Sequence, residues 1–246
     1  MTMRLAIFAD GEVGEKILDV LLNQYQSDVA VVVSTGKNNI KRMADKSGIE
    51  SLVFQNEGDL INKIPHDVDL GLLAWWPKII TEDLIKIPKM GFINTHPSFL
   101  PWNRGKHYNF WALVENTPFG VTLHKVDKGI DTGAIVAQLP IPYDWTDTGE
   151  SLYHKAQNAM VELVKMAWPT IRHGDIPAIP QSANAGSFHF ASELENASHI
   201  DLDKFYQGRE ILNLLRARTF SPHPGCWIEE DGQKYEISIR IRKLNQ

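Results

Sequence analysis

Short apolar runs alternate along the first hundred residues with longer segments whose apolar positions recur every three or four residues. The first pair is "RLAIFAD" followed by "GEKILDVLLNQY", and the next is "DVAVVVSTG" followed by "NNIKRMADKSG". Strands buried on both faces of a parallel sheet are nearly continuously apolar, and a crossover helix joins each strand to the next. The pattern therefore predicts an α/β fold with a Rossmann-like, open, mostly parallel sheet flanked by helices.

The pattern changes after residue 175. Residues 176–200 contain Pro177, Pro180 and Gly186 and few periodic apolar positions, which predicts an irregular connection. A short helix is expected around "REILNLLRAR", and Asp231-Gly232 between two alternating runs predicts a β-hairpin. We therefore expect a main domain over residues 1–175, a connection over 176–200, and a C-terminal helix and β-hairpin over 201–246.

The expected hairpin has one apolar face. Alternation along its second strand places four apolar side chains on that face, namely Tyr235, Ile237, Ile239 and Ile241. An isolated hairpin is only marginally stable in water, so this face should be covered by the body of the protein or by a second protomer. We favour a homodimer formed through the hairpin.

A long helix is expected to begin near residue 148. The sequence "DTGE" predicts a capping box in which Asp147 and Glu150 satisfy the first backbone amides. Apolar positions then recur at helical spacing as far as Ala167, so one face of this helix should pack on the sheet.

Composition excludes several classes of partner and site. The net charge is −5 and basic residues are spread along the chain, which disfavours nucleic-acid and anionic-membrane partners. The single cysteine, Cys226, excludes an intramolecular disulfide and a cysteine-based zinc cluster, and no metal site is expected. No apolar run reaches the roughly 20 residues of a membrane span, and no signal peptide is indicated. We expect a cytoplasmic protein.

Polar side chains alternate in "INTHPSFLP", where an apolar run gives way to a Pro turn. Alternation places Asn94, His96 and Ser98 on one side of an expected strand end. In open α/β sheets, ligands bind beyond the carboxyl ends of the strands. The segment 119–143 reads as two extended runs joined by an Asp- and Gly-rich loop, and it is the next element able to bring Asp131 beside that end.

Asn94, His96 and Asp131 together supply the groups of an acyl-transfer site. An imidazole can take a proton from an attacking amine, a carboxylate can fix its tautomer, and an amide N–H can bind the developing oxyanion. Each residue alone would more often be structural. Ser98 does not lie in a nucleophile elbow and Cys226 lies in the tail, so direct transfer between two bound substrates is the simpler mechanism.

The first strand is followed by a glycine turn, "FADGEVGEK". Gly11 and Gly14 form only G-x-x-G, without the third glycine and the acidic residue of a dinucleotide site. A nicotinamide-dependent oxidoreductase therefore stays a weak alternative, and a plain turn into a helix is at least as good an explanation. The amide of Gly11 at the helix N-terminus can still meet a substrate phosphate.

Two motifs resemble those of the folate-dependent formyltransferases. They are N-x-H-P-S-x-L-P, beginning at Asn94, and H-x-x-D-x-G-x-D-T-G, beginning at His124. The resemblance covers about residues 1–170. It implies that 10-formyltetrahydrofolate is the formyl donor, that the domain over residues 1–175 is catalytic, and that Asn94, His96 and Asp131 are the catalytic residues. A binding module that has lost activity is disfavoured because all three are present.

The resemblance also implies where the folate lies. The pteridine would contact main chain near Ile80 and the loop from Val126 to Asp131, with Trp75, Trp76 and Ile79 as an apolar wall. Without the motifs, a buried strand end packed under a helix would be the preferred explanation of this cluster. The expected folate-binding residues are Trp76, Lys78, Ile80, Val126, Asp127 and Gly129.

The C-terminal tail distinguishes between members of the resembled family. It is too short for the tRNA-binding domain of methionyl-tRNA formyltransferases, and glycinamide ribonucleotide enzymes usually end after the long helix. "RARTFSPHPG" resembles a segment of nucleotide-sugar formyltransferases. The resemblance implies transfer to a nucleotide-linked amino sugar, with dTDP-4-amino-4,6-dideoxyglucose favoured, for O-antigen or another surface glycan of the lipopolysaccharide type.

The family leaves other acceptors open. They are GDP-perosamine, a dTDP-3-amino sugar, a UDP-amino sugar and glycinamide ribonucleotide, and hydrolysis of the formyl-folate would need no acceptor at all. Lys78 and Arg104 are candidate contacts of substrate phosphate, together with Gly11. The alternative for both cations is simple solvation at the surface.

Overall fold

The computed structural model describes residues 3–182 and 185–244. Its contacts divide the chain into two compact units, each assembled from three segments. The first unit comprises Met1–His96, Val121–Leu139 and Asn158–Gln181. The second unit comprises Pro97–Gly120, Pro140–Gln157 and Ser182–Gln246. Each unit is described by itself below.

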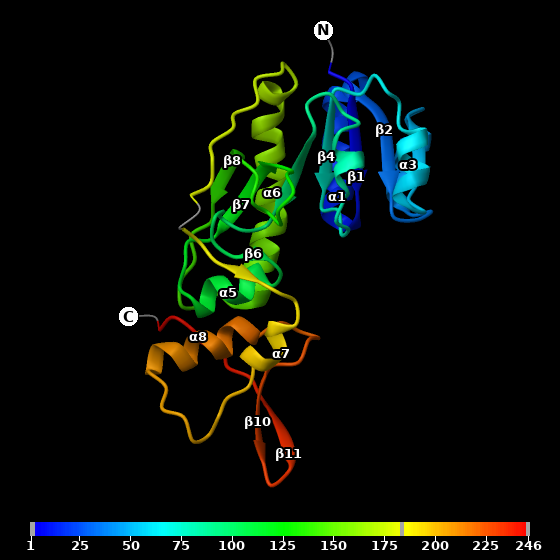
Figure 1. The fold of residues 1–246 in the computed structure, drawn as a ribbon. Coiled ribbons are helices and arrows are strands. Elements are labelled where there is room, and N and C mark those ends of the chain that lie inside the picture. Colours follow the sequence, from blue (N-terminus) through cyan, green and yellow to red (C-terminus); the bar gives the residue numbers. More distant parts are fainter. Residues whose placement is uncertain (1–2, 183–184, 245–246) are drawn as a thin grey trace. The chain divides into compact units, whose positions relative to one another are not determined.

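The first unit is built on a seven-stranded sheet with the order β3-β2-β1-β4-β5-β7-β8 (Figure 1). The first five of these strands pair in parallel, and β7 pairs antiparallel with β5. The predicted Rossmann-like fold is confirmed. The strands are β1 Leu5–Ala9, β2 Val29–Ser34, β3 Glu50–Val53, β4 Leu70–Ala74, β5 Phe92–His96, β7 Gly120–Lys125 and β8 Ile135–Pro140.

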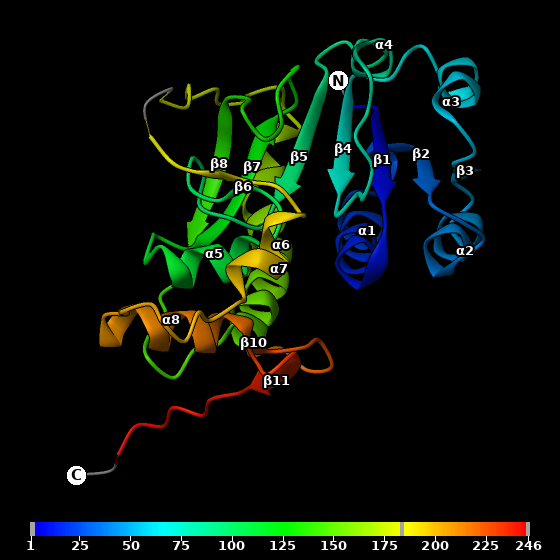
Figure 2. The same ribbon diagram turned by 60° about the horizontal axis from the view of Figure 1, so that its bottom comes forward.

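Helices flank this sheet. On one side α3 and α4 contribute Leu60 and Leu84 to an apolar cluster with Ala6 and Phe8 of β1. The alternate residues of β1 are also fully buried and point the other way, as strand alternation requires. The helices of this unit are α1 Gly11–Tyr25, the 3-10 turn η1 Gln26–Asp28, α2 Asn39–Lys46, α3 Glu57–Lys63 and α4 Glu82–Ile85 (Figure 2).

The long helix α6, Gly149–Ile171, contributes to both units, because the division falls between Gln157 and Asn158. The second unit further contains α5 Tyr108–Val114, α7 Glu193–Ala197 and α8 Gly208–Arg218. Its strands pair two by two: β6 Arg104–Gly105 with β9 Phe188–His189, and β10 Cys226–Glu230 with β11 Gln233–Ile237.

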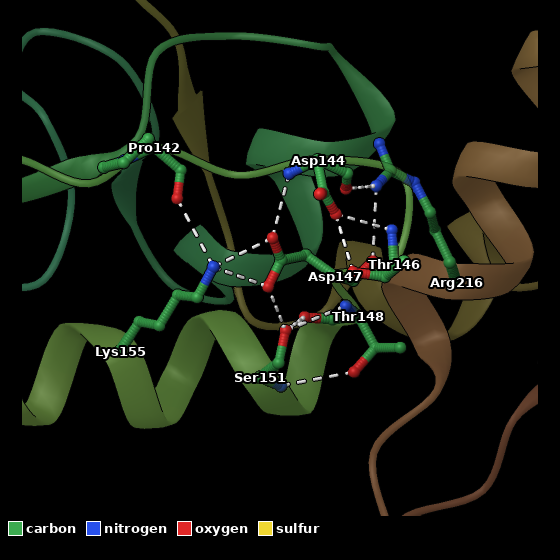
Figure 3. Close-up of polar contacts among 8 residues, drawn as sticks. All are labelled: Pro142, Asp144, Thr146, Asp147, Thr148, Ser151, Lys155 and Arg216. Atoms are coloured by element: carbon green, nitrogen blue, oxygen red, sulfur yellow. Dashed lines mark hydrogen bonds and ion pairs between the residues drawn. The ribbon is translucent and has the colours of Figure 1, made fainter. Parts of the chain in front are cut away.

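The start of α6 differs from the expected capping box by one residue. The amide of Ser151 donates to Oγ1 of Thr148, and the amide of Thr148 donates to Oγ of Ser151 (Figure 3). The expected capping box between Asp147 and Glu150 was wrong because the Asp147 carboxylate accepts hydrogen bonds from other groups. Its carboxylate accepts from the amide of Asp144 and from Lys155. Burial alone would raise the pKa of Asp147, but these donors outweigh it and the pKa is lowered.

Arg216 holds the same loop from the side of α8. Its side chain is buried, and Nη1 donates to the backbone carbonyls of Asp144 and Asp147 at 2.6 and 3.2 Å (Figure 3). Nε donates to Asn213 of the same helix at 3.0 Å. This arginine of the "RARTF" segment therefore has a structural task within the second unit.

The predicted hairpin is present. Asp231 and Gly232 both have positive φ, as a two-residue turn between twisted strands requires. The second strand is shorter than expected: β11 ends at Ile237, and its paired register with β10, among the residues that the structure describes, ends there too. The expected apolar face is therefore confirmed only as far as Ile237.

Candidate active site

Strand β5 carries two of the predicted catalytic side chains at its C-terminal end. Asn94 and His96 lie on one side of the strand, while Thr95 points the other way and donates to the carbonyl of Leu73 at 2.9 Å. The Thr95 hydroxyl also accepts from the amide of Trp75, which has a positive φ. Neighbouring strand ends are thereby fixed to each other beneath the two polar side chains.

Strand β7 brings a second histidine to the same place. Its antiparallel register sets His124 directly opposite Asn94 and sets Thr122 opposite His96. Opposite residues of an antiparallel pair share a face of the sheet, so His124 joins the polar cluster. The sequence reasoning missed this residue as a site member, although it opens the second motif.

Asp131 lies between the two imidazoles. Its Oδ2 is 3.4 Å from Nδ1 of His96, and its Oδ1 is 3.4 Å from Nε2 of His124. All three side chains are largely buried, with 7%, 11% and 3% of the side-chain surface exposed for His96, Asp131 and His124. A carboxylate facing Nδ1 favours the proton on that nitrogen and leaves Nε2 of His96 as the basic position.

The amide of Asn94 faces His124 and Asp131. Its Nδ2 is 3.2 Å from Nε2 of His124 and 3.5 Å from Oδ1 of Asp131. Nδ1 of His124 lies 2.8 Å from the carbonyl oxygen of Lys125, which can only accept, so Nδ1 carries a proton. In the neutral ring, Nε2 then accepts from Asn94 and fixes which end of the amide bears the N–H groups.

The loop that presents Asp131 is folded by its own motif residues. Oδ1 of Asp127 accepts from the amide of Gly129 at 3.1 Å and from the hydroxyl of Thr132 at 2.7 Å. Asp131 has φ of 56°, in the left-handed region that non-glycine residues seldom occupy. A Cβ on Gly133 would lie 1.7 Å from the carbonyl oxygen of Lys125, so only glycine fits there. The motif thus encodes the turn as well as the carboxylate.

Two of the predicted folate-binding residues have buried side chains. Trp76 and Ile80 are 9% and 6% exposed and belong to the apolar cluster of the first unit. The indole of Trp76 meets Phe8 and Phe54 edge to face, with ring centroids 5.3 and 5.7 Å apart. These side chains pack in the core, and any contact of Ile80 with folate would be made by main chain, as expected.

The other expected folate-binding residues lie on two loops, after β4 and after β7, and most of them are exposed. Ile79 exposes 82% of its surface, and Nζ of Lys78 lies 5.0 Å from the centroid of the Phe54 ring. Val126 is half-buried, with its amide donating to the carbonyl of Phe92, whereas Asp127 and Gly129 are exposed. An apolar side chain held in water beside a strand end is available to a flat ligand.

Gly11 and Gly14, which follow β1, are glycines for different physical reasons. Gly11 starts α1 with φ of 60° and is exposed. A Cβ on Gly14 would lie 2.9 Å from the carbonyl oxygen of Ala74, so this glycine allows the helix to approach β4 closely. Gly14 is therefore explained by packing, while phosphate binding at Gly11 stays a prediction.

Arg104 and Ser98 belong to the second unit. Arg104 is half-buried on β6, and its amide donates to the carbonyl of Ser187 at 3.0 Å. Ser98 is completely buried. The structure thus brings Asn94, His96 and Asp131 together in the first unit, with His124 added, and it leaves a phosphate contact of Arg104 as a prediction.

Residues 3–182 and 185–244 contain neither a candidate metal site nor a candidate membrane-spanning helix. No group of three or more His, Cys, Asp or Glu side chains in this part of the chain is arranged to hold a metal ion. No helix there is long and apolar enough to cross a membrane.

Two known protein families match parts of this chain. The family described as "Formyl transferase" matches residues 3–167, and "N-formyltransferase dimerization C-terminal domain" matches residues 193–243. The bifunctional polymyxin resistance protein ArnA of Wigglesworthia glossinidia brevipalpis is 30% identical over 240 residues. That alignment covers 92% of this chain, and the chain spans only 36% of the length of this curated relative.

Two solved structures share the fold. A 4-N formyltransferase from Francisella tularensis is 25% identical and superposes with a TM-score of 0.78 over 98% of this chain and 99% of its own. The formyltransferase PseJ from Anoxybacillus kamchatkensis, in complex with UDP-4,6-dideoxy-4-formamido-L-AltNAc and tetrahydrofolate, is 26% identical. Its TM-score is 0.58 over 86% of this chain and 97% of its own. From the extent of the family match, together with the two motifs that form the polar cluster, the chain belongs to the formyl transferase family.

Proposed function

We propose that this enzyme transfers the formyl group of 10-formyltetrahydrofolate to the amine of a nucleotide-linked amino-dideoxy sugar. The observation that carries the proposal is the buried cluster in which Asp131 faces Nδ1 of His96 beside the amide of Asn94. The Francisella neighbour is a 4-N formyltransferase, and PseJ holds both a formamido sugar nucleotide and tetrahydrofolate. We take dTDP-4-amino-4,6-dideoxyglucose as the acceptor, for synthesis of a surface glycan such as an O-antigen.

His96 is the proposed general base. The uncharged sugar amine attacks the formyl carbon, so a C–N bond forms and the carbonyl becomes a tetrahedral oxyanion. Nε2 of His96 takes the proton of the attacking amine while Asp131, 3.4 Å from Nδ1, stabilises the imidazolium. The bond from the formyl carbon to N10 of the folate then breaks. N10 takes up the proton that His96 gained, relayed by Asp131 directly or through water, so that tetrahydrofolate and the formamide leave and His96 is neutral again.

Asn94 is the proposed oxyanion donor. A primary amide has two N–H groups, and one of them is directed at Nε2 of His124 at 3.2 Å. The other N–H faces Oδ1 of Asp131 at the longer distance of 3.5 Å, and it would turn to the formyl oxygen as negative charge develops there. His124 contributes by holding the Asn94 amide in the orientation that presents nitrogen to the substrate.

The remaining contacts extend the same proposal to the ligands. The pteridine would lie on main chain at Ile80 and along the loop from Val126 to Asp131, with the exposed Ile79 against its face. Lys78 and Arg104 are proposed as contacts of phosphate or folate carboxylate, and the amide of Gly11 as a donor to phosphate.

A homodimer is proposed for the C-terminal region. The matched family is described as a dimerization domain, and it includes the hairpin of β10 and β11. Cys226 at one end of the apolar face is buried, with Sγ 3.4 Å from the carbonyl oxygen of Leu214 in α8. Tyr235 on the same face leaves 48% of its surface exposed. Helix α8 therefore covers only part of this face, and a second protomer would cover the rest.

The test follows release of tetrahydrofolate from 10-formyltetrahydrofolate while dTDP-, UDP- and GDP-linked amino sugars are offered in turn. Replacement of His96 by Asn should lower kcat by about 10²–10⁴-fold, because the general base is lost. His66→Asn changes an exposed histidine of the same unit and should leave the rate unchanged.

Each outcome of this assay has a separate meaning. Release that depends on one acceptor, and fails in His96→Asn, supports transfer and identifies the sugar and its nucleotide. Release without any acceptor means hydrolysis of the formyl-folate. No release with any of the acceptors, or full activity of His96→Asn, refutes the proposed function.

A further inference from the structure

The chain returns to the sheet of the first unit after α6. Ile179 pairs antiparallel with Ile135 at the start of β8, with N–H to O distances of 2.8 and 2.9 Å in the two directions. This bridge extends the edge of the sheet by one short segment of the expected irregular connection. It places the following residues beside the loop that joins β7 to β8.

Gln181 lies two residues beyond that bridge and clamps the loop. Its Nε2 donates to the carbonyl oxygens of both Asp131 and Gly133, each at 2.8 Å. Both N–H groups of one amide are thereby used on the two carbonyls that flank Thr132. Both distances are at the short end of the range for N–H to O bonds, so the two contacts are well made.

The clamp acts where the loop most needs support. Asp131 is held in the left-handed region, a conformation that is unfavourable for a non-glycine residue and persists only when its surroundings fix it. On the side before Asp131, the turn is held by the Asp127 carboxylate, which accepts from Gly129 and Thr132. Gln181 secures it at and after Asp131.

The orientation of the Asp131 peptide decides where its carboxylate points. Oδ2 lies 3.4 Å from Nδ1 of His96, which is already at the limit of a useful contact. A rotation of this peptide that moved the carboxylate by 1 Å would break the contact. Strand β5 does not compensate, because it fixes His96 and does not fix Asp131.

We propose that Gln181 is a positioning residue, which holds the Asp131 peptide so that the carboxylate meets His96. This inference rests on the proposed function, in which Asp131 orients the general base. It assigns a task to a residue that lies outside both motifs and 50 positions away from Asp131 along the chain. Gln181 itself touches no reacting atom.

The side chain must be an amide for this task. Met has nearly the same length and shape but no donor, so Gln181→Met removes both hydrogen bonds without adding charge. Gln181→Glu keeps the shape and turns a carboxylate toward two carbonyl oxygens, which should repel the loop. Gln26→Met is the matched control, because the amide of Gln26 also donates to a backbone carbonyl, that of Ser47, at an exposed position between α1 and β2.

Steady-state kinetics and hydrogen exchange test the inference together. We expect Gln181→Met to lower kcat by roughly 10- to 100-fold, as misplacement of a catalytic group does. The KM values for both substrates should stay within about twofold, because neither ligand loses a contact. Amides of residues 127–133 should exchange faster, and Gln181→Glu should show the same changes more strongly. Gln26→Met should match the wild type in all of these measurements.

Three results would overturn the proposal. One is a kcat of Gln181→Met within about twofold of wild type. The second is a higher KM at unchanged kcat, which would make Gln181 a binding residue. The third is unchanged exchange of residues 127–133, and this readout needs no turnover. Failure of the proposed function would show instead as an inactive wild type, and hydrogen exchange would still decide whether the clamp exists.

Discussion

Gly133 provides the sharpest single test of how the loop that presents Asp131 is built. A Cβ added at this position would lie 1.7 Å from the carbonyl oxygen of Lys125 and 2.7 Å from its carbonyl carbon. Ordinary van der Waals contact begins near 3.4 Å, so Gly133→Ala requires a displacement of about 1.7 Å. The obstacle is backbone, which cannot turn away as a side chain would. The Lys125 carbonyl accepts from His124, so the displacement reaches the polar cluster.

Two magnitudes follow from this overlap. Overpacking of this kind costs about 1–3 kcal/mol of unfolding free energy, which for a chain of this length lowers Tm by roughly 2–12 °C. A 1 Å misplacement of a catalytic group can lower the rate by about 100-fold, and we expect kcat to fall at least that far.

The assay combines thermal unfolding with tetrahydrofolate release at saturating concentrations of both substrates. Gly36→Ala is the matched control, because a Cβ there would meet nothing within 4 Å and its φ lies outside the left-handed region. We expect the control to keep its Tm and its kcat. If Gly133→Ala behaves like Gly36→Ala in both measurements, the close approach of Gly133 to Lys125 is refuted as a constraint on the site.

Three further predictions concern the C-terminal region. Tyr235→Asp should shift the sedimentation coefficient from dimer to monomer, because it places a charge on the exposed part of the apolar face; an unchanged mass would exclude this face as the contact. Burial raises the pKa of the Cys226 thiol to about 12, so the native protein should not react with a thiol reagent at pH 8, and prompt labelling would show that the site is open. Because the unfolded thiol ionises near pH 9 and the folded one near 12, stability is unaffected by this group below pH 9. The contribution of this group should then fall by about 1.4 kcal/mol per pH unit up to 12, and urea unfolding of the wild type and of Cys226→Ala at several pH values can isolate it.

The sequence was sufficient to predict the features that depend on residues close together in the chain. Alternation placed Asn94 and His96 on one side of β5, and Asp231-Gly232 identified the turn of the hairpin. Both depend on the geometry of adjacent residues, which the residue pattern reflects directly. The end of β11 could not be read in the same way, because Ile239 continues the alternation and only the absence of a paired strand ends the element.

Competition between polar groups explains the misplaced helix cap. Asp147 is a good N-cap residue by type, and so is Thr148. The choice between them depends on Lys155 and on the amide of Asp144, both of which engage the Asp147 carboxylate. Lys155 lies on the helix that is being capped, eight positions after Asp147. Its hydrogen bond to the Asp147 carboxylate can therefore form only once the helix has formed.

His124 and Gln181 were missed for a different reason. His124 opens the second motif but was given no role there, and Gln181 lies outside both motifs. Each residue acquires its contacts through pairing at long range, His124 opposite β5 and Gln181 beside β8. The pairing of the two strands could have suggested His124. An antiparallel strand that leads into Asp131 must place alternate residues opposite Asn94 and His96. No comparable rule would have found Gln181.

These two residues also show how differently the halves of the cluster are held. Asn94, His96 and His124 stand on paired strands, where the hydrogen bonds of the sheet fix each backbone position. Asp131 stands on a loop in a strained conformation, and its position depends on the turn at Asp127, the close approach of Gly133 and the clamp from Gln181. Since the 3.4 Å contact between Asp131 and His96 tolerates little movement, substitutions far from any substrate should act on the rate through this carboxylate. The stiffness of the loop, more than that of the strands, then sets how well the base is oriented.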